Sequence, residues 1–124
     1  MMKKLMVVDD NDLIRKIAAR ILRRAGYTVI EAVNGLDALH KLNSNEVDMV
    51  ITDLRMPEMD GLELIKERRA VPAYTDLPVV VMSAEVQEYT RIEAEKAGAI
   101  DWITKPFLRH QLIAAVSKSA LQEI

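Results

Sequence analysis

Residues 5–12, LMVVDDND, join a short apolar run directly to four polar residues. The run Leu5–Val8 is typical of a strand that is buried on both faces of a parallel sheet. Asp9–Asp12 then offer several N-caps for a helix, and Gly26 stands where such a helix would end. Between them the apolar residues recur at helical spacing, at Ile14, Ile17, Ala18, Ile21, Leu22 and Ala25. The basic residues fall mostly on the other side of this helix, at Arg15, Lys16, Arg20, Arg23 and Arg24. The stretch therefore predicts a buried strand followed by an amphipathic helix.

The same strand-then-helix unit recurs along the rest of the chain. Apolar runs predict further strands at residues 28–32, 49–52, 79–82 and 102–103. Helical spacing and end signals predict helices at residues 36–42, 62–70, 88–97 and 108–121. Five strands alternating with five helices favour a single-domain, doubly wound (βα)5 α/β sandwich, in which helices cover both faces of a parallel sheet.

Length and composition narrow the class of protein further. The 124 residues suit one domain, and 17 basic against 19 acidic residues give no electrostatic case for nucleic acid as a partner. The lack of cysteine excludes a disulfide scaffold and a thiolate zinc site. No apolar run approaches the ~20 residues of a membrane span, and Met1–Lys4 is too short for the charged region of a signal peptide. We expect a soluble, cytoplasmic protein without a membrane partner.

Polar residues follow the predicted strands at the point where each strand ends. Asp9 and Asp10 follow the first strand, Asp53 the third, Ser83 the fourth and Lys105 the fifth. In an open α/β sheet, the ligand crevice lies outside these carboxyl ends. Three carboxylates that converge there would repel one another unless a cation lay between them. Carboxylates with phosphate oxygens suit Mg²⁺, or Mn²⁺ in its place. We therefore expect a metal site at this edge.

Phosphoryl chemistry accounts for the remaining polar residues of this edge. Lys105 and Ser83 would hold a phosphoryl group, and Asp53 is the candidate nucleophile because it stands alone between a strand and a turn. Helix capping is the plainer reading of Asp9–Asp12, and each other residue has an ordinary surface role when taken alone. Capping, however, predicts polar residues only after the first strand, so the joint placement favours a site.

Four motifs in this order resemble the receiver domain of the response regulator family in two-component signalling, chemotaxis regulators included. The resemblance covers residues 4–121. The motifs are Val7-Val8-Asp9-Asp10, Asp53-Leu54-Arg55-Met56-Pro57 with Asp60-Gly61, Met82-Ser83-Ala84 and Lys105-Pro106-Phe107. The resemblance implies a flavodoxin-like sheet of order 2-1-3-4-5, the order known for the chemotaxis member of the family. It also implies one receiver domain over residues 1–124, with no output domain.

The resemblance assigns a role to each site residue. Asp53 matches the aspartate that takes a phosphoryl group from a kinase phosphohistidine, and Ser83 and Lys105 match the residues that hold this group. Asp10 matches the direct Mg²⁺ ligand, Asp9 its companion, and Arg55 the residue whose main-chain carbonyl also binds the metal. Trp102 matches the aromatic switch that turns inward when Ser83 moves toward the phosphate, although an ordinary core aromatic is the alternative. The Lys105–Pro106 bond is commonly cis in the family.

Two further hypotheses concern residues around this site. Arg55 and Glu85 are expected to help set the lifetime of the aspartyl phosphate, since a guanidinium suits carboxylate or phosphate oxygens. A solvated surface pair is the alternative. Leu13, Ile17 and Arg20 on the first helix are expected to form a docking face for the kinase.

The resulting reading is a switch that phosphorylates itself, dephosphorylates slowly and acts on no external substrate, so it is not an enzyme in the usual sense. Its expected partners are a sensor histidine kinase or a histidine phosphotransfer protein and an unidentified downstream protein, with the chain monomeric or dimeric on phosphorylation. A pseudo-receiver that is never phosphorylated is the main alternative. A phosphohydrolase with an aspartate nucleophile is less favoured because Arg55 stands where its second aspartate belongs. A flavin carrier would need a Ser/Thr/Gly-rich loop in place of Asp9–Asp12.

Overall fold

A computed structural model describes residues 3–84 and 87–121 of the chain. A parallel sheet runs through the centre in the order β2-β1-β3-β4-β5, as expected from the resemblance. The strands are β1 (Lys4–Val8), β2 (Thr28–Ala32), β3 (Met49–Thr52), β4 (Val79–Ser83) and β5 (Ala99–Thr104). The helices are α1 (Asp12–Arg24), α2 (Gly35–Leu42), α3 (Gly61–Arg69), α4 (Glu88–Ala97) and α5 (Arg109–Leu121), with a 3₁₀ turn, η1, at Pro72–Tyr74.

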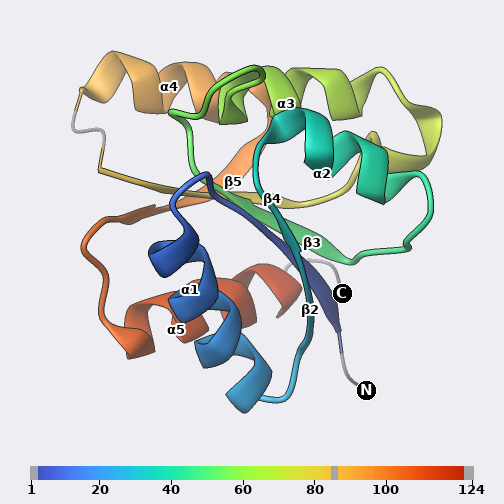
Figure 1. The fold of residues 1–124 in the computed structure, drawn as a ribbon. Coiled ribbons are helices and arrows are strands. Elements are labelled where there is room, and N and C mark those ends of the chain that lie inside the picture. The colour runs from blue at the N-terminus through green and yellow to red at the C-terminus, as the bar shows by residue number, and fades with distance from the viewer. Residues whose placement is uncertain (1–2, 85–86, 122–124) are drawn as a thin grey trace.

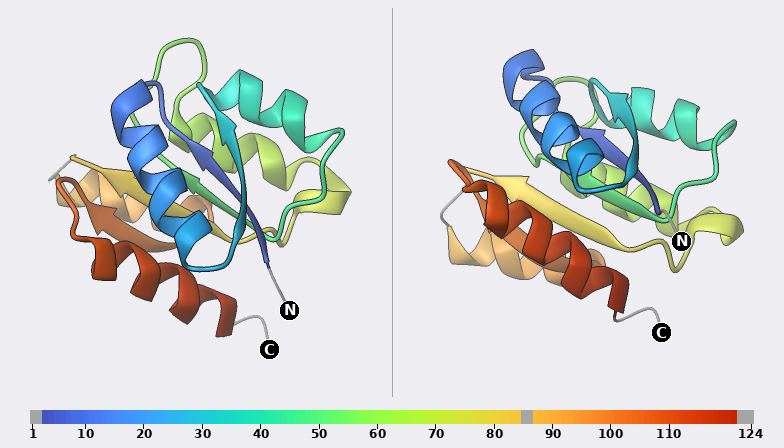
Figure 2. Two further views of the ribbon diagram at one scale, coloured as in Figure 1. Left: turned by 60° about the horizontal axis from the view of Figure 1, so that its bottom comes forward. Right: turned by 90° about the horizontal axis from the view of Figure 1, so that it is seen from below.

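The helices cover both faces of the sheet. Figure 1 shows α1 and α5 on one side and α2, α3 and α4 on the other, and Figure 2 shows α1 and α5 side by side. Each face has its own apolar core. One core joins side chains of α1 and α5 to the sheet, including Leu22 and Leu112, and the other joins α2, α3 and α4, including Leu42 and Leu64. The predicted doubly wound α/β sandwich is therefore confirmed.

The ends of the helices follow from local hydrogen bonds. Asn11 caps α1, because its side chain accepts a bond from the main-chain N–H of Ile14. Asp60 caps α3 in a reciprocal capping box with Glu63. Gly26 and Gly98 both have positive φ angles, which explains why α1 and α4 end there. Most predicted bounds agree with these ends within about two residues.

Two expectations were wrong. β5 is six residues long and not two, since it begins at Ala99. Arg15, counted with the basic outer side of α1, is buried at 6% exposure. Ile17 was listed among the apolar residues of α1 and was also expected on its docking face, and its 43% exposure agrees with the docking face. The inner side of α1 is formed by Arg15 with Ala18, Ala19 and Leu22.

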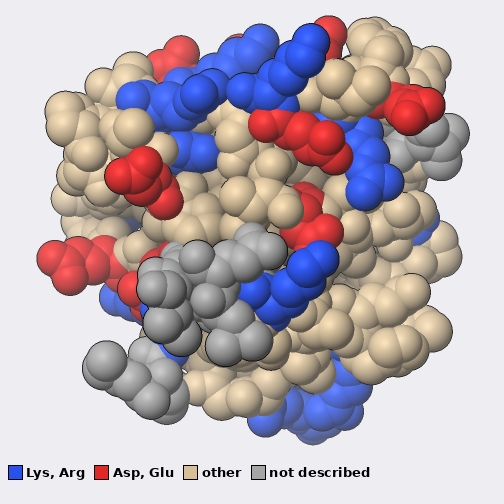
Figure 3. Space-filling view, turned by 180° about the vertical axis from the view of Figure 1, so that it is seen from behind, with Lys and Arg blue, Asp and Glu red and all other residues tan. Residues whose placement is uncertain are grey.

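The outer surface is charged, and one of its basic patches runs along an edge of the molecule. Figure 3 shows Lys and Arg gathered along the top of the rear face, where α3 and α4 lie. The last turns of these helices carry the exposed Lys66, Arg69 and Lys96, where cations complement the helix dipole. Within the described part of the chain, each helix is too short or too polar to cross a lipid bilayer.

Candidate functional site

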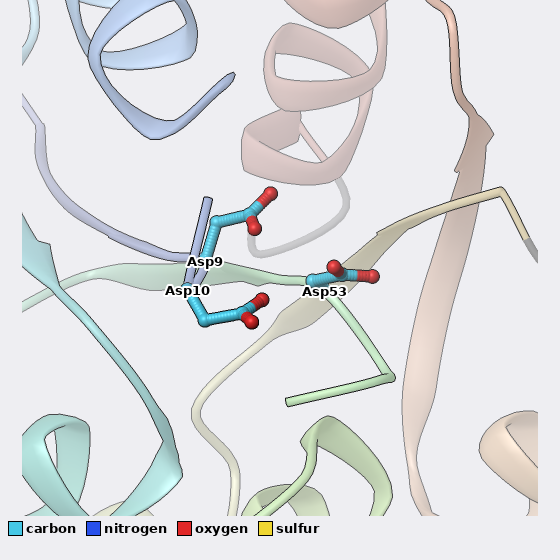
Figure 4. A group of neighbouring side chains, drawn as sticks. All are labelled: Asp9, Asp10 and Asp53. Atoms are coloured by element: carbon cyan, nitrogen blue, oxygen red, sulfur yellow. The ribbon is translucent and has the colours of Figure 1, made fainter. Parts of the chain in front are cut away.

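Three aspartates converge at the carboxyl edge of the sheet. Asp9 and Asp10 follow β1, Asp53 follows β3, and Figure 4 shows the three side chains beside one another. One carboxylate oxygen from each lies within 4.8 Å of the others. β1 and β3 are direct neighbours, and the main-chain N–H of Asp53 donates to the carbonyl of Val8 at 2.9 Å. The sequence-predicted cluster is therefore brought together by strand pairing.

Lys105 closes the cluster from the opposite side. Its Nζ lies 2.6 Å from Asp9 Oδ2 and 3.1 Å from Asp53 Oδ2. Its own N–H donates to the carbonyl of Ser83 at 2.9 Å, which ties the segment after β5 to the end of β4. The Lys105–Pro106 bond is cis, as the resemblance implies. The lysine is thus held over the two buried aspartates.

Burial and neighbouring charges shift the pKa values of the buried groups in this cluster. Burial raises the pKa of Asp53, and the charge of Asp9 adds to this effect, although Lys105 and the N–H of Leu54 oppose it. Burial by itself would lower the pKa of Lys105, but its bonds to Asp9 and Asp53 outweigh burial and raise it. Three carboxylates and one ammonium leave two negative charges in excess, so a divalent cation would balance these four side chains.

A close approach of α3 holds Asp53 at the base of this site. A Cβ on Gly61 would overlap the carbonyl oxygen of Asp53, so only glycine lets the start of α3 lie against this residue. The N–H of Gly61 donates to the carbonyl of Leu54 at 2.9 Å. The Asp60-Gly61 pair therefore both caps α3 and leaves room for the Asp53 main chain.

Comparison with known proteins agrees with this arrangement. Residues 5–117 match the response regulator receiver domain family. The chain belongs to this family. A chemotaxis protein CheY homolog of Campylobacter jejuni is 44% identical over 106 residues, which cover 84% of this chain and 82% of that protein. The recognition of a chemotaxis-like receiver domain is confirmed, and the chain is accordingly a phospho-accepting switch of two-component signalling.

Solved structures of other receiver domains share the fold. Vibrio cholerae chemotaxis protein CheY4 superposes with a TM-score of 0.92 at 32% identity, over 96% of this chain and 99% of that one. The receiver domain of Francisella response regulator 1452 gives 0.89 at 30% identity, over 98% and 99%. The flavodoxin-like fold is thereby confirmed.

The other predicted residues of this receiver domain lie around the aspartates. Ser83 is buried at the end of β4, and Trp102 on β5 is half-buried, with the Arg91 guanidinium carbon 6.0 Å from its ring centroid. Arg55 is exposed. Glu85 lies outside the described residues, so its hypothesis with Arg55 stays a prediction. Leu13, Ile17 and Arg20 are all exposed on α1, as a docking face requires.

Sequence reasoning missed Arg15 as part of the site's surroundings. Its Nη1 donates to the main-chain carbonyl of Asp9 at 2.9 Å. The signal was present in the spacing, because Ala18, Ala19 and Leu22 follow Arg15 by three, four and seven residues and so share its helix face. Grouping the basic residues of α1 by type concealed that position.

Proposed function

We propose that Asp53 takes a phosphoryl group from the phosphohistidine of a sensor histidine kinase or histidine phosphotransfer protein. An oxygen of the Asp53 carboxylate attacks phosphorus, the P–N bond to the imidazole breaks, and its electron pair returns to the imidazole nitrogen. Lys105, with Nζ 3.1 Å from Asp53, would stabilise the charge on the transferred group. The observation that carries this proposal is the buried Asp53 held between Lys105 and two further aspartates.

The same residues are suited to hold Mg²⁺ or Mn²⁺. Asp9, Asp10 and Asp53 would supply carboxylate ligands, and the main-chain carbonyl of Arg55 a further oxygen. When bound, the cation would neutralise the repulsion between the carboxylates and an incoming phosphoryl group. The excess negative charge of the cluster supports this assignment. The chain would act only on its own phosphorylation and dephosphorylation, which is slow, and on no external substrate.

The switch would pass through Ser83 and Trp102. Ser83 lies at the end of β4 beside Lys105. Trp102 on β5 pairs with Val81, which lies on β4 two residues before Ser83. Trp102 borders two hollows, one of about 510 Å³ against α4 and one of about 450 Å³ against α5. These hollows give the indole room to turn when Ser83 is drawn toward a phosphoryl group. A downstream protein would read that change, in a cytoplasmic signalling chain.

The first test is intact mass after incubation with acetyl phosphate, with and without Mg²⁺. A single phosphoryl adduct that needs the metal and is lost in Asp53→Asn is expected. The fluorescence of Trp102, the only tryptophan, is followed in the same samples and should change with the adduct. No adduct and no metal-dependent fluorescence change would instead indicate a pseudo-receiver that works by binding alone.

Arg55 and Glu85 are proposed to set the lifetime of the aspartyl phosphate. Arg55 stands two residues after Asp53 and is exposed at the rim of the site. We expect Arg55→Ala and Glu85→Ala to change the first-order rate of phosphate loss, which is measured by the decay of the phosphorylated mass. Arg69→Ala, which removes an exposed arginine at the far end of α3, serves as the control. An unchanged rate of phosphate loss in both Arg55→Ala and Glu85→Ala would contradict this hypothesis.

A further inference from the structure

Arg15 is the buried arginine of α1, and its guanidinium reaches three separate places. Nη1 donates to the main-chain carbonyl of Asp9 at 2.9 Å, and Nη2 lies 2.7 Å from Asp12 Oδ1. Nε lies 3.2 Å from Glu31 Oε1 on β2. A guanidinium is costly to bury unless its N–H groups are bonded, and here every nitrogen has a partner. The side chain is thus fixed by the segments that it joins.

These contacts connect β2 to both ends of the turn between β1 and α1. α1 packs against β2, as Figure 2 shows, and Arg15 lies at the start of that contact. Asp9 is held on its other side by its N–H, which donates to the carbonyl of Ala32 at 3.1 Å. The main chain of Asp9 is therefore bonded through both its N–H and its carbonyl, and the carboxylates of Asp9 and Asp10 project from this fixed turn.

We propose that Arg15 is a positioning residue for the divalent cation, which it does not touch. The Arg15 side chain bonds both the Asp9 carbonyl and the Glu31 carboxylate and so ties the Asp9 main chain to β2. In this way Arg15 sets where the Asp9 and Asp10 carboxylates lie relative to Asp53. Mg²⁺ demands nearly ideal octahedral geometry, so displacement of two carboxylates weakens binding. Loss of such an outer partner typically lowers metal affinity about 10–100-fold. This inference rests on the proposed metal site.

Arg23 offers a matched control on the same helix. It donates to Glu31 Oε2 at 3.3 Å and to the carbonyl of Val29 at 2.9 Å. Arg23 therefore bonds the same acidic residue of β2 as Arg15. Its second bond is to Val29 and not to Asp9. Removing Arg23 disturbs the α1–β2 contact while leaving the bond to Asp9 in place.

The test is the Mg²⁺ dissociation constant of the folded protein by titration calorimetry, with thermal unfolding measured in parallel. Arg15→Met is expected to raise this constant about tenfold, whereas Arg23→Met should leave it unchanged. Arg15→Lys should recover it only in part, because one ammonium cannot make all three contacts. A lower melting temperature with an unchanged dissociation constant in Arg15→Met would show a purely structural role and overturn the inference.

Two further outcomes keep the inference separate from the proposed function. If Arg15→Met does not fold, the Mg²⁺ dissociation constant is measured for Glu31→Gln and Arg15→Lys instead. An unchanged constant in both variants would overturn the positioning role of Arg15. If the unmodified protein itself binds no Mg²⁺, the metal site fails, and the role of Arg15 fails with it. If the unmodified protein binds Mg²⁺ tightly and the variants bind it with the same dissociation constant, the metal site stands and only the role of Arg15 is contradicted.

Discussion

Asp53 is subject to two opposing influences within one side chain. Burial disfavours its charge and raises its pKa, while Lys105 at 3.1 Å favours the charge. Because the net pKa is raised, the folded state binds more protons than the unfolded state near the titration of Asp53. The free energy of unfolding therefore decreases as pH rises through the raised pKa. The candidate nucleophile is maintained at a cost to stability.

The first prediction concerns this cost. Without divalent cations, Asp53→Asn is expected to melt higher than the unmodified protein at about pH 7, because the variant carries no ionised group at this buried position. The difference in melting temperature should narrow as the pH falls toward the raised pKa of Asp53, because the carboxyl then gains its proton. Thermal unfolding over a series of pH values measures this difference.

A charge control accompanies this comparison. Glu67→Gln removes an exposed acid from α3 and should show no comparable gain at neutral pH. Addition of Mg²⁺ should stabilise the unmodified protein, by about 2.7 kcal/mol at one hundred times its dissociation constant, and stabilise Asp53→Asn less. If Asp53→Asn melts at a lower temperature than the unmodified protein at about pH 7 without divalent cations, the proposed cost of the Asp53 charge is contradicted.

At the scale of elements, the ends of α1 and α4 offer a comparison of two glycines. Gly26 and Gly98 both have positive φ, so alanine at either position introduces backbone strain of about 1–3 kcal/mol. A Cβ at Gly26 meets nothing within 4 Å, whereas at Gly98 it would overlap Nη2 of the buried Arg68. Arg68 donates to the carbonyls of Thr75 and Gly98 and so joins α3 to the segments beside it.

The second prediction follows from that difference. Gly98→Ala should lower the free energy of unfolding more than Gly26→Ala, by a further 1–3 kcal/mol or so, because overpacking adds to the strain. Urea unfolding of both variants measures the two losses. Equal losses would show that the Arg68 side chain moves aside freely.

The sequence predicted the elements well where a single physical signal governed them. The buried strands β1, β3 and β4 are short apolar runs, and the carboxyl ends of neighbouring parallel strands must share an edge, so Asp9, Asp53 and their neighbours could be grouped without coordinates. The length of β5 was underestimated because Asp101 interrupts its apolar run. The ion pairs of Lys105 with Asp9 and Asp53, and that of Arg15 with Glu31, could not be predicted, since they depend on how the packed elements bring distant side chains together.

At the scale of the whole molecule, phosphorylation by a partner differs from phosphorylation by a small donor. Leu13 is 68% exposed and Ile17 43% exposed, and both lie on the helix that follows Asp9 and Asp10. Exposed apolar groups near the proposed phosphorylation site suit a partner protein, while a small phosphodonor would need only the site itself.

The third prediction separates these routes. Leu13→Asp with Ile17→Asp should slow phosphotransfer from a cognate histidine kinase, because burying these charges in the interface is unfavourable. The same variant should accept phosphate from acetyl phosphate at the unmodified rate. Arg20→Ala is expected to slow the kinase reaction less. Both rates are measured by radiolabelled phosphate incorporation, and equal slowing with both donors would place the defect in the site and not in docking.

The ion pair between Lys105 and Asp9 spans 96 positions of the chain. During synthesis the residues emerge in order, so the three aspartates leave the ribosome well before this lysine. A nascent chain that has formed only β1, β2 and β3 contains the three aspartates but lacks the Lys105 ammonium that later offsets part of their charge. The complete cluster of three aspartates and one lysine therefore forms only after β5 has paired with β4 and has brought Lys105 to the aspartates.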